Sequence, residues 1–251
     1  MIVYHLLLLI IYMTLRKKKS SNGSTDKSMT DLEGDSYDKG LTVADQAYDH
    51  IINALADGSM FPGMRVKETE LAARLGISRT PIRETLARLV NEGLVSNDPR
   101  RGLIITELDQ SMVGELYEMR RVLESTAAGL AARHATDVEI SVLRNIMEKD
   151  LTETNPQTIA KNNKIFHQVL YTCGHNRYLL KTLQALQNSM LLLGTSTLEN
   201  KERATQAQIE HQQIVEALEA RDAIKAAQMA SDHISNAYKE RLNKFLFKNK
   251  L

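Results

Sequence analysis

Three histidines in the C-terminal half of the chain have the surroundings of metal ligands. His167, His211 and His233 each lie among apolar residues at helical spacing, which predicts that they face inward from three different helices. Asn163 precedes His167 by one helical turn, so it shares that face and can present a carbonyl oxygen. Three imidazoles and one oxygen suit a divalent first-row ion such as Zn²⁺ or Ni²⁺. Spacing alone leaves open the alternative that the histidines are scattered through a core.

A second group of side chains has the chemistry of a nucleic-acid contact. Arg79 and Arg83 lie one turn apart near the start of a helix expected over residues 78–91. A guanidinium group matches the paired acceptors of guanine and also binds phosphate. The apolar positions of this helix predict a buried face that leaves Arg79, Thr80 and Arg83 outside. Those apolar positions are Ile82, Leu86, Leu89 and Val90.

The elements around these arginines form a predicted winged helix-turn-helix over residues 41–108. Apolar periodicity predicts helices over 43–55 and 68–75 before the one that carries the arginines. Gly76 is placed to end the second helix in the left-handed conformation, and Ser78 is placed to cap the third. Short β-type runs at 94–95 and 103–105 predict a hairpin, whose tip carries Arg100, Arg101 and Gly102.

The remaining residues, 109–251, predict an all-α bundle. This stretch is rich in helix-forming residues and has one proline. Breaks in its periodicity divide it into about six helices, which we expect to pack as antiparallel neighbours. The overall fold class is therefore mainly α. The predicted helices cover residues 112–134, 137–151, 158–173, 178–195, 201–220 and 223–247.

Residues 1–40 differ from the rest of the chain. An apolar run over 2–13 is followed by a basic run and then by a polar segment. The apolar run is shorter than the roughly 20 residues of a spanning helix, so a membrane partner is not expected. We interpret this segment as a disordered or mis-annotated N-terminal extension, with a weak membrane tether as the alternative.

Composition limits the remaining functions. The net charge is +1, so any nucleic-acid site must be a local patch; residues 41–108 hold eight Lys and Arg against nine Asp and Glu. The single cysteine, Cys173, excludes a disulfide framework and fits a reducing cytoplasm. No nucleophile, base and orienting group occur together in the sequence. A catalytic metal site also needs a nearby carboxylate base, and Glu210 is expected to face away from the histidines. A metallohydrolase is therefore the less favoured interpretation.

Residues 71–95 and the RRG that follows them resemble the winged helix of GntR-family transcription regulators. The sequence of residues 71–95 is LAARLGISRTPIRETLARLVNEGLV. A single winged helix binds only half of a site, so we expect a homodimer on a palindromic double-stranded operator. Thr69 stands where some relatives carry an operator-contacting arginine. The resemblance implies that the residues at the DNA are Ser78, Arg79, Thr80, Arg83 and Gly102, beside Arg101 of the hairpin tip.

The C-terminal region resembles the FCD effector domain of the FadR subfamily. The matching segments include FHQVLYTCGHNRYL at 166–179 and EHQQIVEAL at 210–218. In metal-dependent members the corresponding ligands are one aspartate and three histidines, which implies His167, His211 and His233. Asn163 stands at the aspartate position, and a neutral amide is a weaker ligand than a carboxylate.

The resemblance further implies that a small carboxylate, such as a sugar acid or hydroxy acid, binds at the metal and releases a repressor from its operator. Arg120 is the candidate clamp for that carboxylate, with an ion pair to Glu124 as its alternative role. Two other interpretations stay open. The domain can bind an acyl-CoA or another ligand without a metal, or it can sense the metal ion itself.

Overall fold

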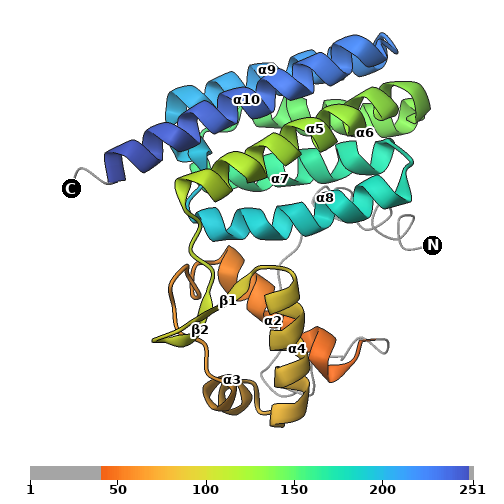
Figure 1. Ribbon diagram of the computed structural model, residues 1–251. Coiled ribbons are helices and arrows are strands. Elements are labelled where there is room, and N and C mark those ends of the chain that lie inside the picture. The colour runs from red at the N-terminus through yellow and green to blue at the C-terminus, as the bar shows by residue number, and fades with distance from the viewer. Residues whose placement is uncertain (1–40, 249–251) are drawn as a thin grey trace, which may run out of the picture. The chain divides into compact units, whose positions relative to one another are not determined.

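The computed structural model describes residues 41–248, which fold mainly into α-helices with one small two-stranded sheet (Figure 1). This confirms the predicted fold class. Within these residues, none of the helices has both the length and the apolar content needed to cross a membrane. The expectations for residues 1–40, an extension or a membrane tether, lie outside the described residues.

Residues 41–108 contain the predicted helix-turn-helix and hairpin. The helix boundaries follow from local signals: Thr42 and Asp45 form a capping box at the first helix, and Gly76 ends the second with a φ of 66°. Antiparallel pairing joins Val95 to Ile105 and Asp98 to Gly102. The elements are α2 (Val43–Ala56), α3 (Glu68–Leu75), α4 (Arg79–Asn91), β1 (Val95–Asp98) and β2 (Gly102–Ile105).

Two details of α4 differ from the prediction. Val90 is 40% exposed, whereas Thr85 is buried and its hydroxyl donates to the carbonyl oxygen of Ala44 at 2.9 Å. That hydrogen bond allows a threonine to occupy the face that joins α4 to α2. Ser78 occupies the position that precedes the helix, but its side chain makes no capping hydrogen bond.

Residues 109–248 form the predicted bundle, in which α5 packs most extensively against α10, and α6 packs against α7 and α9. Alanines on α5 and α10 allow this close contact, because Ala127, Ala131 and Ala226 are completely buried. The helices are α5 (Gln110–His134), α6 (Asp137–Leu151), α7 (Pro156–Cys173), α8 (Arg177–Met190), α9 (Lys201–Glu219) and α10 (Ala223–Lys248).

Side-chain caps set the start of most bundle helices. Asp109, Asn155, Asn176 and Asn200 each accept hydrogen bonds from backbone amides in the first turn that follows. One boundary was predicted wrongly: the helix expected over 178–195 ends at Met190. The chain then tightens into the 3₁₀ turns η1 (Leu191–Leu193) and η2 (Thr197–Glu199) around Gly194, whose φ is 70°.

Candidate nucleic-acid interface and candidate metal centre

The N-terminal end of α4 presents polar side chains outward. Ser78, Arg79, Thr80 and Arg83 are all exposed, as the periodicity of the helix predicted. Arg79 forms no ion pair within residues 41–248. Behind them, Ile82, Leu86 and Leu89 are buried and fix the rotation of the helix. The exposed end of α4 can therefore enter a groove while the rest of the helix stays packed.

Arg83 has an acidic neighbour that sequence spacing did not reveal. Its Nε donates to Oε2 of Glu68 on α3 at 2.8 Å, and 64% of the Arg83 side chain is exposed. Exposed pairs of this kind contribute little to stability. The Glu68 carboxylate instead sets the position of the Arg83 guanidinium and reduces the positive charge of this face.

The hairpin tip is held by Asp98. Its Oδ1 accepts hydrogen bonds from the backbone amides of Arg100 and Arg101 at 2.8 and 2.7 Å, and these bonds lower the pKa of the carboxyl group. Gly102 has a φ of 76°, which side-chain-bearing residues rarely adopt. Arg101 itself contacts Asp98 and Glu107 through Nη2, so its guanidinium is partly engaged within the protein.

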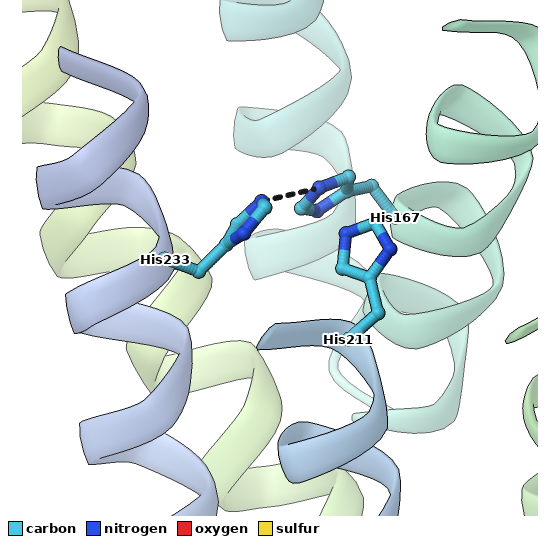
Figure 2. A group of neighbouring side chains, drawn as sticks. All are labelled: His167, His211 and His233. Carbon is cyan, nitrogen blue, oxygen red and sulfur yellow. Dashed lines mark hydrogen bonds between the residues drawn. The ribbon is translucent and has the colours of Figure 1, made fainter. Parts of the chain in front are cut away.

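The three predicted histidines converge inside the bundle. His167 on α7, His211 on α9 and His233 on α10 are each no more than 3% exposed, and their ligand nitrogens lie within 4.8 Å of one another. Figure 2 shows the three imidazoles pointing toward a common centre, with Nε2 of His167 3.2 Å from Nε2 of His233. His211 stacks on Phe166, with ring centroids 4.1 Å apart. The alternative of scattered histidines is therefore wrong.

A buried carboxylate orients one of these imidazoles by a hydrogen bond, and a second carboxylate lies close to another imidazole without hydrogen-bond geometry. Nδ1 of His233 lies 2.7 Å from Oε2 of Glu210, and Nδ1 of His167 lies 2.9 Å from Oε2 of Glu124. A carboxylate at Nδ1 favours the tautomer whose Nε2 lone pair is free for a metal ion. The expectation that Glu210 faces away from the histidines is wrong, because the pitch of α9 turns it toward α10.

Each of these carboxylates is also paired with a buried arginine. Arg120 Nε donates to Glu124 at 2.8 Å, and Arg203 Nη2 lies 2.8 Å from Glu210. Burial alone would raise the pKa of Glu124, but the Arg120 charge acts together with His167 and Tyr171 and holds that pKa well below its usual range. Arg203 was missed by sequence reasoning, since a buried arginine has no periodic signal of its own.

The electrostatics of the cluster favour neutral imidazoles. Burial lowers the pKa values of His211 and His233 well below the usual histidine value, and the neighbouring imidazoles and Arg203 act in the same direction. Nε2 of His211 has no hydrogen-bond partner among the described residues. Neutral imidazoles with inward lone pairs are the form that binds a divalent ion, so the residues present fit such an ion.

A cavity of about 200 Å³ reaches the cluster at His167. Asn163 lines this cavity and is half-buried, while Arg120 and Lys164 add positive charge to the wall. Arg120 lines the cavity and pairs with Glu124, so the predicted ion pair is confirmed and the clamp role stays a prediction. The apolar part of the wall comes from Leu55, Ala56, Leu183, Leu186, Met190 and Leu191.

Other candidate groups lie apart from this cluster. His134 is exposed at the end of α5, and His175 lies 3.0 Å from Glu139 in the turn before α8. Burial raises the pKa of the Cys173 thiol to about 12, which leaves it unreactive as a nucleophile at neutral pH.

Family models match both parts of the chain. The model described as bacterial regulatory proteins, gntR family, matches residues 43–105, and the FCD domain model matches residues 115–236. The first match covers the helix-turn-helix and its hairpin. The second covers the elements that carry all three histidines.

Individual relatives align with most of the chain. The HTH-type transcriptional regulator YdhC of Bacillus subtilis is 30% identical over 197 residues, 76% of this chain and 87% of the relative. A protein of Paenarthrobacter nicotinovorans, named a probable repressor of a D-xylose utilization operon, is 30% identical over 77% of this chain and 86% of its own length. The solved structure of E. coli McbR/YncC aligns with a TM-score of 0.66 at 21% identity, over 82% of this chain and 99% of that one, and so shares its fold.

Proposed function

Because the chain belongs to the GntR family of transcriptional regulators and carries an FCD domain, we propose that a small carboxylate bound at a metal ion controls its binding to an operator. The observation that carries this proposal is the meeting of three buried histidines with a cavity lined by Arg120. The relatives are regulators, so the expectation of a regulator rather than an enzyme is confirmed.

We infer that the DNA contact is made by the exposed end of α4 and by the hairpin tip. Arg79 and Arg83 supply the guanidinium groups, with Ser78 and Thr80 beside them at the helix start. Arg101 and Gly102 at the tip reach the neighbouring backbone or groove. One such unit binds half of a site, so we expect a homodimer on a palindromic double-stranded operator, acting in the cytoplasm as a repressor.

His167, His211 and His233 would hold the metal ion, with Asn163 as an additional oxygen donor. A site of nitrogen donors favours Zn²⁺ or Ni²⁺. A divalent ion held by these residues would supply a positively charged centre to which a carboxylate could bind. Asn163 adds no negative charge, so the bound anion would neutralise the charge of the metal ion. Arg120 and Lys164 in the cavity wall attract the anion.

The size of the cavity supports a small acid rather than an acyl-CoA. Sites for drug-sized ligands span about 300–1,000 Å³, and the volume here is about 200 Å³. A hydroxy acid or sugar acid fits such a volume, and its hydroxyl and carboxylate groups can face the polar wall. The apolar wall then covers the carbon skeleton.

Two measurements test this function on the full chain. Metal content is measured by mass spectrometry for the wild type, His167→Ala and His211→Ala, with His134→Ala as control. We expect about one Zn²⁺ or Ni²⁺ per chain in the wild type and the control, and loss in both cluster variants. A metal-free wild type, even after reloading, would refute the metal centre.

The effector is sought with an operator duplex selected by the protein from a random DNA pool. Operator affinity of the metal-loaded protein is then measured against a panel of hydroxy acids and sugar acids. We expect one of these acids to weaken binding, and Arg120→Ala to remove that response. Arg121→Ala is the matched control, because Arg121 pairs with Glu118 on the surface. A response to the metal ion alone would identify a metal sensor instead.

A further inference from the structure

The last turn of α8 and η1, residues 187–192, lies against both the effector cavity and the helix-turn-helix. Gln187, Met190 and Leu191 line the cavity. Leu192 is 4% exposed and belongs to the same apolar cluster as Ile51 and Leu55 of α2. This short segment, residues 187–192, is called the junction below.

A polar contact strengthens the junction. Nδ2 of Asn188 donates to the hydroxyl oxygen of Tyr48 on α2 at 3.0 Å. The Tyr48 hydroxyl in turn donates to Oε2 of Glu92 at 2.5 Å. Glu92 caps the C-terminal end of α4, whose opposite end carries Arg79 and Arg83. A chain of hydrogen bonds thus runs from the junction to the DNA-reading helix.

The Tyr48 ring is fixed from a second side. The guanidinium carbon of Arg88 lies 3.6 Å from the ring centroid, and Arg88 Nε donates to Oε1 of Glu92 at 3.0 Å. Tyr48 is 6% exposed. Tyr48 is thus held by the guanidinium of Arg88 and the carboxylate of Glu92, so a displacement of Asn188 acts on the buried Tyr48 and, through its hydroxyl, on Glu92 at the end of α4.

The cavity wall includes Leu55 and Ala56 at the end of α2, so a molecule in the cavity contacts α2 as well as the junction. A ligand shifts an equilibrium only through contacts that differ between the two states. The junction is placed to make such contacts, since its cavity-lining residues alternate with residues that contact α2.

We propose that the junction transmits occupancy of the cavity to α4, through the hydrogen bond between Asn188 and Tyr48 and the burial of Leu192. The inference rests on the proposed effector site. Loss of this hydrogen bond lowers the coupling between effector and operator without removing either binding site.

The test uses Tyr48→Phe, which keeps the ring under Arg88, and Asn188→Ala. Gln184→Ala is the matched control, because Gln184 is exposed on α8 one turn earlier. For each protein, loaded with Zn²⁺, operator affinity is measured with and without the panel acid that acts on the wild type. Binding of that acid to the DNA-free protein is measured by calorimetry.

We expect the acid to change operator affinity about three- to tenfold less in Tyr48→Phe and Asn188→Ala than in the wild type, while it still binds both variants. The double variant should lose no more than Tyr48→Phe alone, because removing the Tyr48 hydroxyl already removes the contact with Asn188. A wild-type response in both variants would overturn the inference and leave the effector site standing. If no acid acts on the wild type, the effector site is refuted and the inference with it.

Discussion

His233 and Glu210 form the closest imidazole–carboxylate contact of the histidine cluster, with 2.7 Å between Nδ1 and Oε2. Glu210 also accepts a hydrogen bond from Asn236 at 2.8 Å, so its carboxylate has a fixed orientation. The result is an imidazole whose Nε2 faces the other two histidines. Glu210 is not one of the proposed metal ligands, yet it determines which nitrogen of His233 is available to bind a metal ion.

We predict that Glu210→Gln weakens Zn²⁺ binding about 10- to 100-fold, because a neutral amide is a poorer partner for the Nδ1 proton. Competition with a chromogenic chelator measures the affinity. Glu216→Gln is the control, since Glu216 is exposed on the same helix. Unchanged affinity in folded Glu210→Gln protein would contradict the orienting role.

Asn163→Asp should strengthen metal binding about tenfold or more, because a carboxylate replaces a neutral amide at the cavity wall. The added negative charge should also weaken binding of the acid that acts on the wild type, because the new carboxylate already neutralises part of the positive charge that attracts the acid. Chelator competition and calorimetry measure the two effects. A variant that binds both metal and acid as the wild type does would exclude Asn163 from the site.

The metal-free protein should lose stability as the pH falls below about 6.5, the reference pKa of histidine. The unfolded chain gains protons there, whereas buried His211 and His233 resist protonation, so acid favours unfolding. Each histidine contributes up to about 1.4 kcal/mol per pH unit. Urea unfolding at pH 7.5 and 5.5 measures this loss, and His211→Phe should show a smaller one. An equal loss in that variant would assign the acid sensitivity to other groups.

Glu68→Gln should tighten operator binding about two- to fivefold, because it removes a negative charge beside Arg83 at the proposed DNA face. Arg79→Ala should weaken binding by about tenfold or more, since a guanidinium contact to base or phosphate is lost. Fluorescence anisotropy at several salt concentrations measures both. Arg177→Ala, exposed on α8, serves as control, and equal affinities for all three variants would remove α4 from the interface.

The sequence by itself determined the elements and the identity of the histidines. Helical periodicity and the breaks in it are local signals, so the helices of both parts were predicted with small boundary errors. The largest error, at the end of α8, arose because apolar residues continue through η1 while the backbone changes at Gly194.

Only the tertiary structure decided what surrounds these residues. Glu210, Arg203 and Asn188 have ordinary helical positions in the sequence, and their partners lie 23, 30 and 140 residues away along the chain. Periodicity identifies which face of a helix is buried, but not which neighbour that face meets or how two helices are rotated against each other. Those contacts arise from packing between helices, and they turn separate histidines into a cluster with oriented lone pairs.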